Sequence, residues 1–416
     1  MIDIDKWTEI YNTVKKHKLR TALTAFGVFW GIFMLVVLLG AGKGLENGIT
    51  SEFNIAKNAV FIWTQRTSVP YMGLNAGRFI QMTNDDVAAI KANIPEVGVV
   101  APSNQLQGDF TVNYKDKSSA FTVNGETPEL LSVKPLKVTT GRFVNGIDMQ
   151  EKRTVAIVGP RVLEVLFPGE EQPIGKYISI KGSYFQVVGT FEPLGKGEDV
   201  MEDAKVIYIP HTTLQQTYNE VNKVGFMALI PKPGVPAAVI EDKVKTLLMQ
   251  RHQVAPEDLK AFGSANVEEE FQEVQGLFAG IAGFSWLVSI GTILAGIIGV
   301  GNIMLIVVKE RTKEIGVRKA LGATPWSIIS LIIQESIVIT GFAGYMGLLT
   351  GTGIIALIEY FMRKFDVQAG FFGIPEVNLG IAVTATVLLV FTGALAGLIP
   401  ATKAARVNPV VALRDE

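Results

Sequence analysis

The sequence LFAGIAGFSWLVSIGTILAGIIGVGNIMLIVV, residues 277–308, decides the fold, because its 32 consecutive residues carry no charge. The hydrocarbon core of a bilayer is about 30 Å thick, and an α-helix needs roughly 20 apolar residues to cross it. This run is therefore expected to cross a membrane with residues to spare. Three further uncharged runs of sufficient length, residues 21–42, 336–358 and 377–402, predict three more transmembrane helices.

The segment before residue 277 favours one long helix. Glu268, Glu269, Glu270 and Glu273 lead into the apolar run without a proline. A single helix of roughly 40 residues would reach about 60 Å, twice the thickness of the hydrocarbon core, so its surplus would extend outward as a stalk. The alternative is a tilted or kinked membrane helix preceded by a separate surface helix.

Lysines and arginines in the short flanks orient these helices. They concentrate in residues 1–20, in residues 309–325 and in the C-terminal tail, whereas the loop 359–377 contains only Arg363 and Lys364. Since basic residues mark cytoplasmic loops, we expect a multi-pass protein of the inner (cytoplasmic) membrane with both termini inside the cell and residues 43–275 outside. A cleaved signal peptide is disfavoured, because the first apolar run is too long and its end makes a poor cleavage site.

The N-terminal helix expected in residues 5–18 is amphipathic. Trp7, Ile10, Tyr11 and Val14 share one face, so the helix should lie along the inner leaflet, either as a simple anchor or in contact with a partner. In chain order, the predicted segments are an amphipathic helix (1–20), the first transmembrane helix (21–42), an extracytoplasmic domain with the stalk (43–275), the second transmembrane helix (276–308), a cytoplasmic coupling loop (309–326), the third transmembrane helix (327–358), a short external loop (359–377), the fourth transmembrane helix (378–400) and a cytoplasmic tail (401–416).

Residues 43–275 alternate strand-like and helical segments, which predicts an inserted α+β domain of one or two lobes. β-Branched and aromatic residues indicate strands, and Thr83 is placed to cap a helix. The predicted strands are residues 59–67, 120–124, 154–158, 177–180, 184–191 and 205–209, and the predicted helices are residues 83–94, 161–167 and 235–250.

Composition excludes several classes of function. The chain has 38 Lys and Arg against 39 Asp and Glu, so it lacks the basic balance that nucleic-acid binding needs. It has no cysteine, its three histidines are scattered, and no phosphate-binding loop, dinucleotide fingerprint or serine-hydrolase motif is present. We therefore expect no active site, no metal site and no cofactor in this chain.

The loop KERTKEIGVRKALGATPW, residues 309–326, mixes charges of both signs at helical spacing. Glu314 lies four residues before Arg318, where the two can pair on one helix face. Apolar residues interrupt the charges, which favours two short helices broken at Gly316 and Gly322 over a disordered, solvated loop. After the loop, Glu335 is expected near the inner boundary, either with a structural partner such as Arg318, Arg20 or a backbone donor, or in a coupling role.

Small residues recur at four-residue spacing in the apolar runs. Such pairs let helix backbones approach closely in lipid. We expect packing faces, within one subunit or between subunits, at Gly27 and Gly31, Gly347 and Gly351, and Gly393 and Gly397.

Several motifs resemble one family along nearly the whole chain. The run KERTKEIGVRKALGA, residues 309–323, is similar to the signature loop of the MacB/FtsX-like permeases of ABC transporters, the mechanotransmission or type VII class. Further similar motifs are KLRTALTAFGVFWG (18–31), GRF (141–143), VAIVG (155–159), LF (166–167), PIGK (173–176), FQVVG (185–189) and PATKAARVNPVVALR (400–414).

The resemblance implies a membrane subunit that works with a separate ATPase, which binds the ATP and docks beneath the loop. Because only 20 residues precede residue 21, in contrast to fused exporters of the family, we expect a separately encoded ATPase. Glu310, Arg311, Glu314, Arg318 and Lys319 would make polar contacts, and Ile315, Leu321 and Ala323 would pack. The full predicted interface is Lys309, Glu310, Arg311, Lys313, Glu314, Ile315, Gly316, Arg318, Lys319, Ala320, Leu321, Gly322 and Ala323.

The leading functional hypothesis is an export permease that acts as a dimer, with a second copy or a paralogue, in the lipid bilayer. It would drive a periplasmic adaptor and an outer-membrane channel. Lipoprotein release and activation of cell-wall hydrolases are alternatives within the same class, and a membrane-anchored receptor or sensor is the alternative from another class. No charged residue lies at mid-depth of a span, which argues against a polar translocation route through the membrane.

Overall fold

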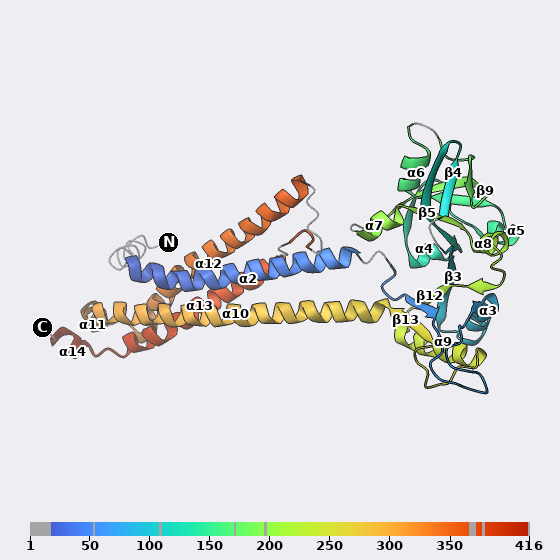
Figure 1. Cartoon of the computed structure of the whole chain (residues 1–416). Coiled ribbons are helices and arrows are strands. Elements are labelled where there is room, and N and C mark those ends of the chain that lie inside the picture. The colour runs from blue at the N-terminus through green and yellow to red at the C-terminus, as the bar shows by residue number, and fades with distance from the viewer. Residues whose placement is uncertain are drawn as a thin grey trace. The chain divides into compact units, whose positions relative to one another are not determined.

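The computed structural model describes residues 18–52, 55–107, 110–169, 172–194, 198–365, 372–376 and 379–414. The chain forms two compact units (Figure 1): one comprises Met1–Ile49 with Gly276–Glu416, and the other Thr50–Gln275. The amphipathic helix predicted in residues 5–18 lies almost entirely outside the described residues.

Among the described residues, four helices are long and apolar enough to cross a membrane. They are α2 (Lys18–Glu52), α10 (Val267–Glu310), α12 (Pro325–Lys364) and α13 (Leu379–Ala405). Each predicted span lies within one of these helices, except that the fourth predicted span begins at residue 378, one residue before α13. The four-helix prediction is therefore confirmed. α2 and α12 extend beyond the predicted limits, to Glu52 and Lys364, because no proline or left-handed residue stops them.

The helix α10 is one unbroken element of 44 residues, as the acidic segment before the apolar run predicted. At 1.5 Å per residue it is about 66 Å long. The alternative of a separate surface helix before the membrane span is therefore wrong.

The predicted packing glycines all lie at contacts between helices of the same chain. A Cβ atom added at Gly27 would lie 3.1 Å from the Cα of Gly296 on α10, and one at Gly347 would lie 2.5 Å from the carbonyl oxygen of Phe29 on α2. Gly31 likewise faces α10, Gly351 faces α2, and Gly393 and Gly397 face α12. Backbone contacts of this kind fix the mutual approach of the four helices, because no side-chain rotation relieves them.

The other unit contains two lobes with separate apolar cores. In the first lobe, the strand order is β13 (Phe262–Asn266), β1 (Val60–Thr64), β12 (Phe226–Pro231) and β3 (Val97–Gln105), with every neighbouring pair antiparallel. Helices α3 (Asn84–Asn93) and α9 (Ala237–Arg251) pack on this sheet. The order 4-1-3-2 with two crossover helices is that of a split β-α-β fold.

The second lobe is inserted between β3 and β12 and is a closed six-stranded barrel. Its ring runs β4 (Phe110–Tyr114), β5 (Lys117–Glu126), β10 (Val206–Pro210), β7 (Val155–Val158), β9 (Ser183–Pro193) and β8 (Tyr177–Ile180), and β8 pairs with β4 again. Alternate residues such as Val112, Phe121 and Phe185 point inward and fill it.

The remaining elements are short. Between β5 and β12 they are α4 (Leu130–Val133), β6 (Leu136–Gly141), α5 (Gly146–Glu151), α6 (Pro160–Leu166), α7 (Glu198–Asp203) and α8 (His211–Thr217). The strands β2 (Met82–Thr83) and β11 (Lys223–Val224) form a separate two-stranded sheet.

A seam of buried polar residues joins the lobes where β3 leaves the first sheet and pairs with β5 through Asn104 and Gln105. Here the Ser103 hydroxyl donates to the Glu126 carboxyl at 2.6 Å, and Glu126 is only 2% exposed. The second Glu126 carboxyl oxygen has no hydrogen-bond partner among the described residues. The connection between the lobes therefore contains a carboxyl group shielded from water.

Candidate coupling site at the ends of the membrane helices

The predicted coupling loop is one helix and a tight turn, not two helices. After α10 ends at Glu310, α11 (Thr312–Ala320) runs without a break through Gly316. The prediction of a break at Gly316 is wrong, because this glycine instead allows a close approach: a Cβ atom there would lie 2.8 Å from the Cβ of Ala412. Gly322, at φ +97°, lies in the turn that follows, a conformation that favours glycine.

The next helix begins directly after this turn. Thr324 is its N-cap and accepts a hydrogen bond from the backbone N–H of Ser327 at 3.3 Å, with Pro325 in the first turn. α12 is therefore continuous from Pro325, and residues 325–326, assigned to the loop from sequence, belong to the third membrane helix.

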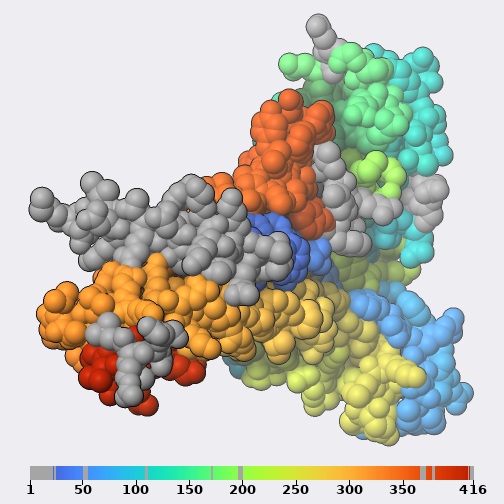
Figure 2. All heavy atoms as spheres, turned by 90° about the vertical axis from the view of Figure 1, so that its left-hand side faces the viewer, coloured from blue at the N-terminus to red at the C-terminus, as the bar shows by residue number. Residues whose placement is uncertain are grey.

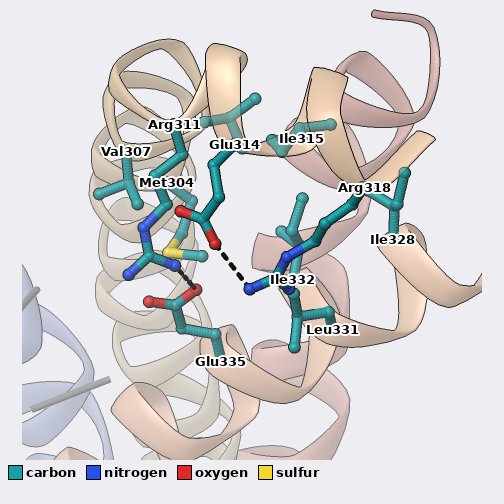
Figure 3. Close-up of a pocket in the computed structure, with 11 residues that line it drawn as sticks. Met304, Val307, Arg311, Glu314, Ile315, Arg318, Ile328, Leu331, Ile332 and Glu335 are labelled. Atoms are coloured by element: carbon teal, nitrogen blue, oxygen red, sulfur yellow. Dashed lines mark hydrogen bonds and ion pairs between the residues drawn. The ribbon is translucent and has the colours of Figure 1, made fainter. Parts of the chain in front are cut away.

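A small pocket lies between the end of α10, α11 and the start of α12 (Figure 3). Its walls are mainly apolar, and it encloses about 30 Å³, enough for roughly two water molecules. Its lining residues are Met304, Val307, Val308, Arg311, Glu314, Ile315, Arg318, Ile328, Leu331, Ile332 and Glu335.

Two ion pairs flank this pocket. The Arg311 guanidinium lies 3.4 Å from the carboxylate of Glu335, whose side chain is 5% exposed, and Figure 3 shows the two groups pointing toward one another. Arg318 pairs instead with Glu314 at 2.6 Å, the predicted four-residue pair. Glu335 thus has a structural partner in Arg311 at the junction of α10 and α11, a residue that the prediction did not name for this role; the side chain of Arg20 lies outside the described residues.

The C-terminal motif also packs against α11. Lys319 donates to the carbonyl oxygens of Ala405 at 2.8 Å and Val407 at 2.7 Å, at the end of α13. Asn408 then accepts from the N–H of Val410 at the start of α14 (Pro409–Arg414). Figure 2 shows this red segment against the orange surface of the loop region. Two motifs that the sequence marks separately are thus one structural site.

The remaining loop residues form an outward face of mixed charge and apolar side chains. Leu321 is 83% exposed and Trp326 73% exposed, and Val317 and Val410 are also exposed. The predicted interface did not include Val317 or Val410, although the Asn-Pro pair at 408–409, a helix-start signal, pointed to the helix that carries Val410. The predicted interface residues that are exposed are Lys309, Glu310, Lys313, Glu314, Ala320, Leu321 and Gly322, and Arg318, Lys319 and Ala323 are half-buried.

Two predicted contact residues face inward. Ile315 is 8% exposed and packs in the core of the membrane unit, and Gly316 is buried against α14. Their side chains are therefore part of the support of α11, not of its accessible surface. No cluster of three or more metal-ligating side chains occurs in the part of the chain that the structure describes.

Comparison with known proteins agrees with this architecture. Residues 21–247 match the family described as MacB-like periplasmic core domain, and residues 286–409 match FtsX-like permease C-terminal. The chain is 29% identical to the macrolide export ATP-binding/permease protein MacB of Rhodospirillum rubrum over 97% of its own length and 59% of that protein. It is 29% identical to the pyoverdine export ATP-binding/permease protein PvdT of Pseudomonas putida over 96% of its length and 58% of that protein.

The fold and the matched segments define a multi-pass membrane protein with an inserted periplasmic-type domain. The chain belongs to the MacB/FtsX-like permease family of ABC transporters. It spans about three fifths of the length of the curated relatives it matches. Among solved structures, the periplasmic region of MacB from Actinobacillus actinomycetemcomitans is 19% identical and covers 53% of this chain and 94% of that one, with a TM-score of 0.43.

Proposed function

We propose that this chain is the membrane subunit of an export-type ABC transporter and that its coupling site receives the motion of a separate ATPase subunit. The ATPase would bind ATP and dock on the outward face of α11 around Leu321 and Lys313. The chain itself would bind no nucleotide and catalyse no reaction. The relatives named for macrolide and pyoverdine export support an export role.

The observation that carries this proposal is the double support of α11. Arg311 and Ile315 tie the helix to α10 and α12, and Lys319 and Gly316 tie it to the end of α13 and to α14. A force applied to the outward face therefore reaches three membrane helices without passing through a flexible loop. Rigid elements of this kind transmit displacements with little loss.

The same proposal places the protein in the inner membrane with α11 and both termini in the cytoplasm, because the basic residues cluster there. It further includes a second permease copy or a paralogue, since ATPases of this kind act as pairs, and a periplasmic adaptor with an outer-membrane channel. The long helix α10 would carry the displacement from Glu310 toward Val267.

A matched set of variants separates docking from transmission. Leu321→Asp places a charge on the outward face, and Leu259→Asp, at a leucine 75% exposed in the other unit, is its control. We expect the wild type and Leu259→Asp to co-purify an ABC ATPase in near-stoichiometric amount from cells, and Leu321→Asp to recover at least tenfold less. Lys319→Met should retain the ATPase but lose ATP-dependent export, because it removes the contact with α13.

Either of two results would contradict the proposal. Wild-type chain that recovers no ATPase lacks the expected partner, and Leu321→Asp that recovers as much as wild type does not dock through this face. Full export by Lys319→Met would show that the contact of Lys319 with the end of α13 does not transmit the motion.

A further inference from the structure

The contact between α2 and α10 is tight at one end of the membrane unit and opens toward the other. A Cβ atom added at Gly27 would lie 3.1 Å from Gly296, and one at Gly31 would lie 2.7 Å from the Ile293 side chain. About three turns further along α2, a Cβ atom at Gly42 would have only Ile281 in reach, at 3.9 Å. The two helices therefore diverge toward the end at which the apolar run of α2 stops.

A cavity of about 180 Å³ lies in this opening. Its walls are mainly apolar, with Lys43 and Glu46 as the charged exceptions, and it opens to the surroundings, since Ile281 is 41% exposed. The side chains that line it come from α2, α10 and the first turn of α13 and are Leu38, Leu39, Gly42, Lys43, Glu46, Phe278, Ile281, Ala282 and Ile381.

The polar end of the cavity holds one ion pair. Lys43 and Glu46 lie 2.7 Å apart, with side chains 40% and 35% exposed. Lys43 is one helical turn beyond Leu39 and is the first charged residue after the apolar run, so the pair lies at the level where acyl chains give way to headgroups. The site thus has an apolar part and a charged part in the order that an amphiphile has in a bilayer.

The surroundings of the cavity and its charged end select its occupant. A Lys43–Glu46 pair at one end of an apolar cavity fits an amphiphile, which has a charged headgroup beside an apolar chain. Water is unfavourable against apolar walls at this depth of the membrane. An acyl chain is narrow enough, apolar and present at high concentration on the open side.

We propose that this cavity binds one acyl chain of a phospholipid from the surrounding bilayer, with the headgroup phosphate at Lys43. In an ethanolamine headgroup, the ammonium group would lie beside Glu46, so that each charge of the Lys43–Glu46 pair would face the opposite charge of the headgroup. The bound lipid would fill the wedge between α2 and α10 as a resident part of the structure, whatever the protein exports.

Native mass spectrometry of the full chain tests this, after transfer from nanodiscs that contain phosphatidylethanolamine, phosphatidylglycerol or phosphatidylcholine. We expect one lipid per chain to survive activation, phosphatidylethanolamine best. Gly42→Leu fills the cavity and should lower retention at least fivefold. Gly283→Leu, on α10 where no atom lies within 4 Å of an added Cβ, is the matched control and should retain the lipid. Lys43→Gln should reduce the preference for phosphatidylethanolamine.

A photoactivatable acyl chain on phosphatidylethanolamine gives a second measurement on the wild-type chain, which does not depend on a variant that folds. We expect adducts within residues 38–46 or 278–282. Equal retention by Gly42→Leu and Gly283→Leu, or adducts only elsewhere, would overturn the proposal. Loss of the lipid on ATP turnover with the ATPase would also overturn it, because it would identify a cargo and not a resident lipid. None of the binding measurements requires that the export function be correct.

Discussion

Glu126 is a single residue whose protonation state is determined by its burial. It accepts a hydrogen bond from Ser103, but it lies at the seam between the two lobes and is only 2% exposed. Burial raises the pKa of Glu126 to about 8. This effect outweighs the hydrogen bond from Ser103 and the charge of Lys134, which both lower the pKa. The group is therefore neutral in the folded protein at pH 7.

This pKa predicts a pH-dependent stability of the unit Thr50–Gln275. Since the folded pKa lies above the unfolded value of about 4.5, the stability is fully present below pH 4.5 and is lost as pH rises through about 8. One pKa unit corresponds to about 1.4 kcal/mol, so the loss amounts to at most about 5 kcal/mol. Thermal unfolding of the full chain in detergent, followed by fluorescence between pH 5 and 9, measures it.

Glu126→Gln should remove most of this dependence, because the amide stays neutral and can still accept from Ser103. Glu151→Gln, at a glutamate whose side chain is 56% exposed, is the control and should leave the pH profile as in the wild type. A profile that does not change in Glu126→Gln would show that another group causes the dependence.

At the scale of elements, α10 is the connection that matters most for the proposed function. It runs from the acidic residues at Val267 to the junction with α11 at Glu310 as one helix of 44 residues. A helix transmits a displacement along its axis only while it stays rigid, and each inserted glycine disfavours the helical conformation by about 1 kcal/mol.

An insertion of Gly-Gly-Ser after Gly276 should therefore uncouple the two ends of α10. We expect the ATPase still to bind and to hydrolyse ATP, and export to fall at least tenfold. The same insertion after Gly73, in a turn of the first lobe at φ +81°, should leave export within twofold of the wild type. Full export with the insertion at Gly276 would exclude α10 as the transmitting element.

At the scale of the whole molecule, the topology can be tested independently of function. The basic flanks predict that residues 43–275 face the outside and that residues 309–326 face the cytoplasm. Protease added to sealed spheroplasts should cleave within residues 43–275 and leave the loop 309–326 intact, whereas permeabilised spheroplasts should lose both. Cleavage of the loop in sealed spheroplasts would reverse the orientation and with it the proposed docking of the ATPase.

The four spans, the long second helix and six strands of the inserted domain were predictable from the sequence, because each depends on local composition and periodicity. Three of the four strands of the first lobe, β3, β12 and β13, were missed, because glycine, alanine and proline interrupt the β-branched pattern there and their pairing with distant strands decides the structure. A run such as residues 277–308 has no alternative but a membrane helix, since any other structure would leave backbone groups unpaired in lipid. Strands such as β7 and β8 were found within a residue of their predicted limits, because β-branched residues and flanking turns mark them.

Only the tertiary structure decided how distant segments combine. That Arg311 reaches Glu335, that Lys319 holds the end of α13, and that Gly316 makes room for Ala412 all depend on the mutual packing of α10, α11, α12, α13 and α14. The same applies to the wedge between α2 and α10 at Gly42. Sequence periodicity reports which face of a helix is apolar, but contacts between elements depend on rotations and separations that all four membrane helices set together.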